Sequence, residues 1–198
     1  MKTSSAELKR TARENLNGKY GIAILVMITA SLIPSALLYP FAENASHGGA
    51  SQRIIYYLAS IIITVIQLLL TCGQLRLHLN IANGQPYQFS DIFFSFRRHP
   101  QKILGAYLLF VLYMIPAVLP GSVLLTFALL LFTDSAPFIG LTVIVLGAGI
   151  IFDIRIALQC SLVFFMLVDN PYASIRGTFR RSKELMEGNK LRLLYLQL

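Results

Sequence analysis

The run of residues 54–71 contains no charged side chain, and it limits the possible folds more than any other feature of the chain. About 18 or more largely apolar residues in a row form a helix that matches the hydrocarbon core of a bilayer, which is about 30 Å thick. Because backbone amides in lipid must bond within the protein, only helices and closed barrels span membranes. The run therefore predicts a transmembrane helix.

The composition places the whole chain in the same class. Hydrophobic residues make up 56% and charged residues 13% of the sequence, whereas soluble domains have about 45–50% apolar and about 25% charged residues. Further apolar stretches lie at about residues 20–41, at 103–132 and within 138–168. We therefore expect an all-α fold with four complete, polytopic transmembrane helices.

Prolines and glycines interrupt two of these stretches. Pro116 and Pro120 make residues 103–132 either one long broken helix or a helix followed by a re-entrant piece. Residues 138–168 are too long for one straight span, and we expect a break at residues 147–149, where two glycines flank Ala148. A polar loop is expected at residues 43–53.

Basic residues predict the orientation in the membrane. The net charge is +8, but nearly all Lys and Arg lie just outside the apolar runs, which indicates topology and argues against a nucleic-acid partner. They form three clusters: Lys2, Lys9, Arg10, Arg13 and Lys19; Arg76, Arg97, Arg98 and Lys102; and Arg176, Arg180, Arg181, Lys183, Lys190 and Arg192. The positive-inside rule places all three clusters, and the N-terminus, in the cytoplasm.

The last cluster is expected on an amphipathic helix over residues 171–187, capped by Asp169 or Asn170. Its apolar stripe would face a basic side that contacts lipid, including anionic lipid, along the cytoplasmic leaflet. Two alternatives are that the charges only set topology, and that the stripe packs on the protein's own spans. The stripe comprises Tyr172, Ile175, Phe179 and Met186, and the basic side comprises Arg176, Arg180, Arg181 and Lys183.

The first and last clusters share a spacing that indicates an internal repeat. Arg10, Arg13, Glu14, Leu16 and Gly18 match Arg180, Lys183, Glu184, Met186 and Gly188 at one constant offset. We therefore expect a single integral membrane domain, residues 1–198, built from helical-hairpin units at approximately 4–82, 83–168 and an incomplete 169–198. Residues 191–198 would reach about 12 Å as a helix, so we expect the chain to be truncated in a fifth span.

Two charges inside the apolar stretch 138–168 predict an intramembrane polar site. A charge at mid-bilayer costs about 2.5–3.5 kcal/mol on insertion scales, so Asp153 and Arg155 need partners. Gln159 lies one turn from Arg155, and Gln67 on the run 54–71 is a cross-helix candidate. The group is either a substrate or ion site, or a set of snorkelling and interhelical polar contacts.

The remaining chemistry-bearing residues form no known pattern. The two cysteines and three histidines are dispersed without metal-ligand spacing, and no nucleophile or nucleotide-binding motif occurs. We therefore expect no catalytic residue, no metal and no cofactor.

Both ends of the chain resemble one family. Val168-Asp169-Asn170-Pro171 with residues 182–190, and the opening residues 6–10 and 18–21, are similar to a bacterial integral membrane family named domain of unknown function 975. The resemblance implies a polytopic membrane protein with no established catalytic residue. Members of that family usually continue into another apolar stretch after the motif Gly188-Asn189-Lys190.

These observations predict a non-enzymatic, multi-pass protein of the bacterial cytoplasmic membrane. It would act through helix packing and contact with the lipid bilayer, as an accessory or envelope-homeostasis component. The alternative is a small transporter or channel subunit with its polar site around Asp153 and Arg155. No protein partner is indicated.

Overall fold

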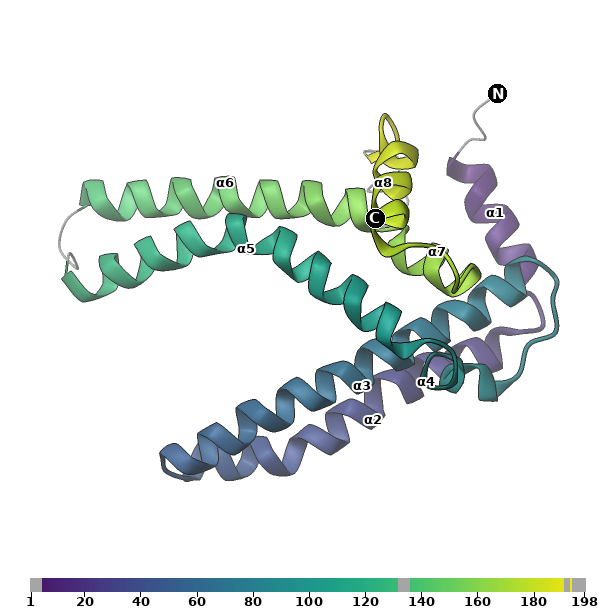
Figure 1. Ribbon diagram of the computed structural model, residues 1–198, viewed down its shortest axis with the longest axis horizontal. Helices are drawn as coiled ribbons and strands as arrows, with labels where there is room; N and C mark the ends of the chain where they lie inside the picture. Colours follow the sequence, from purple (N-terminus) through teal and green to yellow (C-terminus); the bar gives the residue numbers. More distant parts are fainter. Residues whose placement is uncertain (1–4, 132–135, 191–192, 194–198) are drawn as a thin grey trace. The chain divides into compact units, whose positions relative to one another are not determined.

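The computed structural model describes residues 5–131, 136–190 and 193, and in these ranges every regular element is a helix. The all-α prediction is therefore confirmed. The helices are α1 (Ser5–Leu16), α2 (Tyr20–His47), α3 (Ala50–Ala82), the 3₁₀ helix η1 (Phe89–Phe93), α4 (Phe94–Arg97), α5 (Pro100–Leu131), α6 (Ala136–Cys160), α7 (Val163–Asp169) and α8 (Ile175–Met186) (Figure 1).

The chain forms two compact units. The first comprises Met1–Leu104 with Phe164–Ala173, and the second comprises Gly105–Val163 with Ser174–Leu198. The first unit thus contains α1 to α4 and most of α7, while the second contains most of α5 together with α6 and α8. A single integral membrane domain over residues 1–198 stays a prediction.

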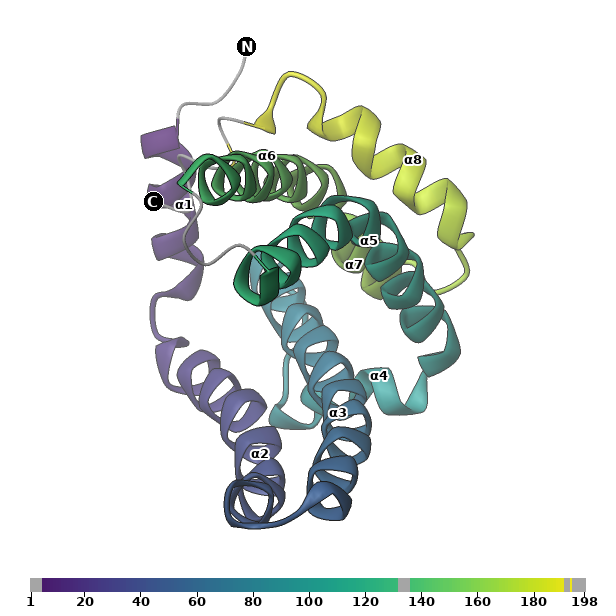
Figure 2. The ribbon, with the colours of Figure 1, turned by 90° about the vertical axis from the view of Figure 1, so that its left-hand side faces the viewer.

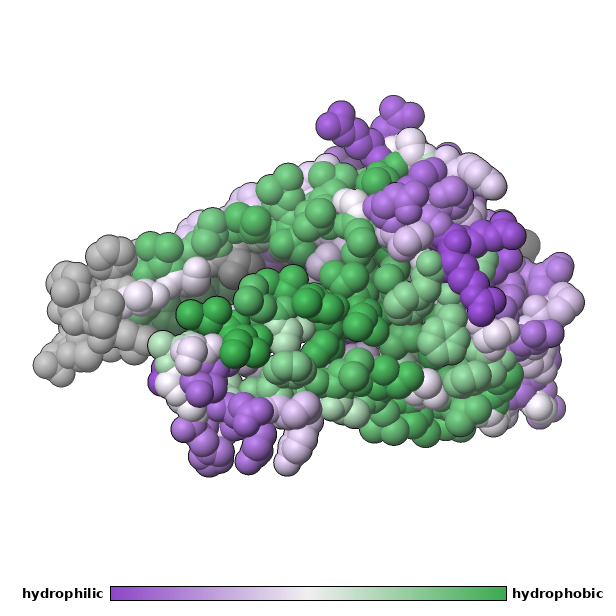
Figure 3. Space-filling model, turned by 60° about the horizontal axis from the view of Figure 1, so that its bottom comes forward, coloured by the Kyte–Doolittle hydropathy of each residue, from purple (hydrophilic) through white to green (hydrophobic). Residues whose placement is uncertain are grey.

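Three helices are long and apolar enough to cross a membrane: Tyr20–His47, Ala50–Ala82 and Gly140–Asp169. The apolar helix Pro100–Pro116 is shorter than a span within the described residues, so the fourth span stays a prediction. Large hydrophobic side chains are exposed along these helices, among them Ile61, Ile62 and Ile144, and Figure 3 shows broad apolar areas on the outer surface. Soluble monomers rarely expose apolar areas of this kind.

α2 and α3 lie side by side as a hairpin (Figures 1 and 2). The polar loop predicted at residues 43–53 is largely helical instead, because α2 continues to His47 and α3 begins at Ala50. The last turn of α2 carries local polar contacts: the Ser46 hydroxyl donates to the Glu43 carbonyl at 2.7 Å, and the Glu43 carboxylate lies 3.6 Å from His47. Only the two glycines between the helices form the turn.

The core of the first unit joins α2, α3 and η1. It is formed by the buried side chains Val26, Ala30, Leu70, Leu77, Ile81 and Ile92. A second cluster, made of Leu69, Cys72, Ile103 and Val168, attaches α7 to α3 and to the start of α5. The ammonium group of Lys102 reinforces this attachment by donating to the carbonyl of Pro171 at 2.7 Å.

The two interrupted stretches are more continuous than predicted. α5 is one long helix that bends along its course (Figure 1) with Pro116 and Pro120 inside it, which excludes a separate re-entrant piece within the described residues. The break predicted at residues 147–149 is wrong, since α6 runs through them and the helix is interrupted at Ser161 and Leu162. Glycine keeps its N–H and costs only about 1 kcal/mol in a helix interior, so it need not end one.

Gly73 allows a close approach between α3 and η1 in the first unit. A Cβ atom at this position would collide with the backbone carbonyl of Ile92. Ile92 is itself fully buried against α3, so the connection between α3 and α5 is fixed by backbone packing at a glycine.

We expect Gly73→Ala to destabilise the protein by about 1–3 kcal/mol, because overpacking forces backbone shifts. Thermal unfolding of the detergent-purified chain measures the change. Gly147→Ala is the matched control, since no atom lies within 4 Å of its added Cβ and the change favours helix. Equal melting temperatures for the two variants would contradict the close contact.

Candidate functional site

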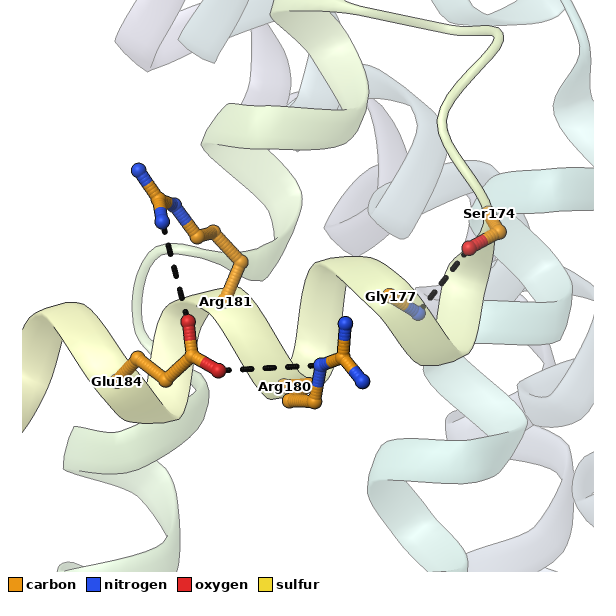
Figure 4. A network of polar contacts seen from close by, with 5 residues as sticks. All are labelled: Ser174, Gly177, Arg180, Arg181 and Glu184. Carbon is orange, nitrogen blue, oxygen red and sulfur yellow. Dashed lines mark hydrogen bonds and ion pairs between the residues drawn. The ribbon is translucent and has the colours of Figure 1, made fainter.

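The helix that carries the last basic cluster begins later than predicted. α8 starts at Ile175, and the hydroxyl of Ser174 caps it by accepting from the Gly177 amide at 3.2 Å (Figure 4). The predicted caps Asp169 and Asn170 are wrong, because the Asn170 side chain accepts from the Tyr172 amide at 3.1 Å and forms a turn before the helix.

The apolar side of α8 packs within the second unit. Phe179 and Met186 are buried, and the Phe179 ring lies 5.6 Å from the ring of Tyr113 on α5. Tyr172 precedes α8 and instead contacts His99 in the first unit. Of the alternatives for this stripe, packing on the protein's own helices is the one observed for Phe179. Lipid contact by the basic side stays a prediction.

Ser182 joins α8 to the end of α6. Its side chain is fully buried, and its hydroxyl donates to the backbone carbonyl of Gln159 at 2.6 Å. Since α6 ends at Cys160, that carbonyl is one of the terminal groups that lack a partner within their own helix. The sequence analysis did not single out Ser182. A serine on the apolar side of an amphipathic helix could have indicated such a buried hydrogen bond.

An open cleft of about 420 Å³ lies among α5, α6 and α8. The residues that line it, called the basic cleft below, are Tyr113, Ile156, Gln159, Cys160, Arg176, Phe179, Arg180 and Lys183. The three cations are spaced by four and three residues along α8, so they share one helix face. Among the described residues no carboxylate lines the basic cleft, so its lining combines three cations with aromatic and aliphatic side chains.

Glu184 is the nearest compensating charge on α8. Its two carboxylate oxygens lie 3.8 Å from the Arg180 Nε and 3.8 Å from an Arg181 terminal nitrogen (Figure 4). All three side chains are more than half exposed, and exposed pairs of this kind contribute at most about 1 kcal/mol. Because this one carboxylate is shared with Arg181, the positive charge of the cleft is only partly offset.

The predicted intramembrane polar site is divided. Gln159 lines the basic cleft, whereas Asp153 and Arg155 do not. One carboxylate oxygen of Asp153 is buried without a hydrogen-bond partner among the described residues, and Arg155 is exposed. Gln67 lies exposed on α3 in the first unit, and its pairing with Asp153 or Arg155 stays a prediction.

In the described part of the chain, no three His, Cys, Asp or Glu side chains lie close enough together to hold a metal ion. Cys72 and Cys160 are both buried and free. The basic cleft is thus the arrangement with the clearest chemistry. Its cations can bind an anion, and its apolar side chains can contact an apolar group attached to that anion.

Comparison with known proteins identifies the family of the chain. The family model described as "Protein of unknown function (DUF975)" matches residues 1–198, which confirms the resemblance found in the sequence. No curated protein and no solved structure matches the chain.

We expect Ser182→Ala to destabilise the protein by about 1–3 kcal/mol, because the Gln159 carbonyl would be left buried without its partner. Unfolding in detergent, followed by circular dichroism, measures the loss. Ser35→Ala is the control, since the Ser35 hydroxyl is exposed and bonds only to its own helix, at the Ser31 carbonyl. A loss no larger than that of the control would show that Ser182 does not hold α8 on α6.

Proposed function

The chain belongs to the DUF975 family, and on this premise we propose that it is a non-enzymatic, multi-pass protein of the bacterial cytoplasmic membrane that binds an anionic lipid. The bound group is a lipid phosphate, held in the basic cleft of the second unit. The protein acts through helix packing and lipid contact, as an accessory or envelope-homeostasis component.

One observation carries this proposal: Arg176, Arg180 and Lys183 line one cleft in which no carboxylate occurs among the described residues. Guanidinium groups form paired hydrogen bonds with phosphate oxygens, and an ammonium group adds a point charge. Ile156 and Phe179 give the same cleft an apolar wall. A lipid has this combination of a phosphate and an attached hydrocarbon chain, whereas a free phosphate would leave the apolar wall unused.

The topology proposed for this function has the N-terminus and the basic cleft in the cytoplasm. The asymmetry of Lys and Arg supports it, because cytoplasmic loops are enriched in these residues. The turn between α2 and α3 would then face outward, and the start of α5 inward.

A repeated helical-hairpin unit, at approximately residues 4–82, 83–168 and 169–198, is also proposed. α1 and α8 each have 12 residues, and their ion pairs Arg10–Glu14 and Arg180–Glu184 occupy matching positions at 3.3 and 3.8 Å. Each helix is followed by a glycine with φ of 75°, at Gly18 and at Gly188. The same helix and the same left-handed turn at both places support duplication of one unit.

Transport is the second candidate function, favoured by one carboxylate oxygen of Asp153 that is buried without a partner among the described residues. A conducting path needs several polar groups along it. The sequence neighbours of Asp153, Phe152 and Ile154, are instead exposed apolar residues. Lipid binding is therefore the preferred function.

We expect the double variant Arg180→Gln with Lys183→Gln to bind phosphatidylglycerol more weakly. Each basic residue near an anionic surface contributes about 1 kcal/mol, so the loss should be roughly 30-fold in affinity. Titration of the purified chain in detergent, read by native mass spectrometry, measures it. Phosphatidylcholine should bind poorly to both proteins, and salt should weaken the phosphatidylglycerol complex.

Arg10→Gln with Arg13→Gln is the matched control for this experiment. It removes the same two positive charges at the matching positions of α1, including the exposed pair of Arg10 with Glu14, and we expect unchanged affinity at the cleft. Unchanged affinity of the α8 double variant, or an equal loss in the control, would refute specific binding by the basic cleft.

The topology is tested by single cysteines in a background with Cys72→Ala and Cys160→Ala. Ser46→Cys should react with an impermeant thiol reagent applied to whole cells, because Ser46 is exposed near the outer turn. Gln101→Cys and Glu187→Cys are also at exposed positions and should react only after the cells are opened. Labelling of Glu187→Cys in intact cells would reverse the proposed orientation.

A further inference from the structure

Three exposed phenylalanines form a stripe along η1 and α4. Phe89, Phe93 and Phe96 are exposed to 37, 38 and 39%, and the rings of Phe93 and Phe96 lie 6.2 Å apart. In water this cluster would be a costly apolar surface on a short connecting segment. We call these three residues the phenylalanine stripe.

The opposite side of the segment is fixed on α3, so the stripe has a defined direction. Ile92 and Ser95 are fully buried, and Ile92 packs at Gly73. The carboxylate of Asp91 accepts hydrogen bonds from the Asn80 amide nitrogen at 3.2 Å and from the backbone of Gln88 at 3.1 Å. The segment therefore cannot rotate to bury the stripe without losing these contacts.

The contact at Gly73 fixes the position of the phenylalanine stripe along the axis of α3. Residues 54–75 carry no charge and cover about 33 Å of helix, close to the thickness of a hydrocarbon core. Gly73 lies two residues before the end of this uncharged run, about 3 Å from it along the axis. The segment packed there lies at the boundary between acyl chains and head groups when α3 spans the membrane.

Basic residues accompany the stripe at this level. Arg97 and Arg98 follow directly and are exposed, and the Arg76 guanidinium carbon lies 5.0 Å from the centre of the Phe94 ring. Apolar side chains beside Lys or Arg are typical of elements that lie in the membrane interface.

We propose that the phenylalanine stripe inserts into the cytoplasmic leaflet as an aromatic wedge, with Arg97 and Arg98 among the lipid phosphates. The inference rests on the membrane placement of α3 in the proposed function, and it is independent of the basic cleft. Lipid is the occupant because the segment connects two apolar helices and is held level with the end of an uncharged run.

The absence of tryptophan from the sequence allows a direct test in the full chain. Phe93→Trp, and separately Phe96→Trp, introduce one tryptophan into protein reconstituted in vesicles of phosphatidylcholine and phosphatidylglycerol. Lipids brominated near the head-group end of the acyl chain should quench its fluorescence more than lipids brominated near the methyl end. Acrylamide in the water should quench it weakly.

Ile62→Trp is the reference, because Ile62 is exposed within the uncharged run of α3. Deep bromine should quench this tryptophan most. If Ile62→Trp behaves so but both stripe tryptophans respond to acrylamide and not to bromine, the wedge is refuted. Protection of the stripe tryptophans from both quenchers would mean that protein, such as a second copy of the chain, covers them, which also overturns the proposal. If Ile62→Trp itself resists brominated lipid, the membrane placement of α3 fails, and the proposed function fails with it.

Discussion

The need of every backbone N–H and C=O for a partner, wherever water is scarce, governs how this chain folds. Helices satisfy that need internally, which is why α2 and α5 continue through two prolines each. A helix end creates carbonyls without partners. At the interruption after Cys160, the Gln159 carbonyl is satisfied by the buried hydroxyl of Ser182. This hydrogen bond, together with the burial of Phe179 and Met186, places α8 and with it the basic cleft.

Hydropathy predicted the elements that are long, and it did so for a physical reason. The transfer free energy of an apolar helix is a sum over many residues, so the spans at α2 and α3 follow from composition alone. The ends of helices were predicted less accurately, because they depend on local hydrogen bonds that hydropathy does not describe. At α8, the Asn170 side chain forms a turn and Ser174 caps the helix.

The basic cleft was only half predictable from the sequence. Helical spacing placed Arg176, Arg180 and Lys183 on one face of a helix, which is a local property. Their meeting with Gln159 depends on packing between α6 and α8, where Phe179 is buried and contacts Tyr113. Periodicity shows that such an apolar side exists, but not which neighbour covers it. Gln159 was grouped with Asp153 because the two residues are close in the sequence. The side chains that line the cleft instead come from three different helices, α5, α6 and α8.

The charges of the basic cleft favour an anion on energetic grounds that do not depend on its identity. Three cations on one helix face repel one another, and the repulsion grows where water is replaced by hydrocarbon, because the effective dielectric constant falls. Glu184 relieves part of it, yet its carboxylate contacts Arg180 and Arg181 at equal distances and does not line the cleft. An anion that enters the cleft relieves repulsion that the protein leaves uncompensated. Because Ile156 and Phe179 line the same cleft, an amphiphile gains from both the cations and the apolar side chains, whereas a fully hydrated ion gains only from the cations.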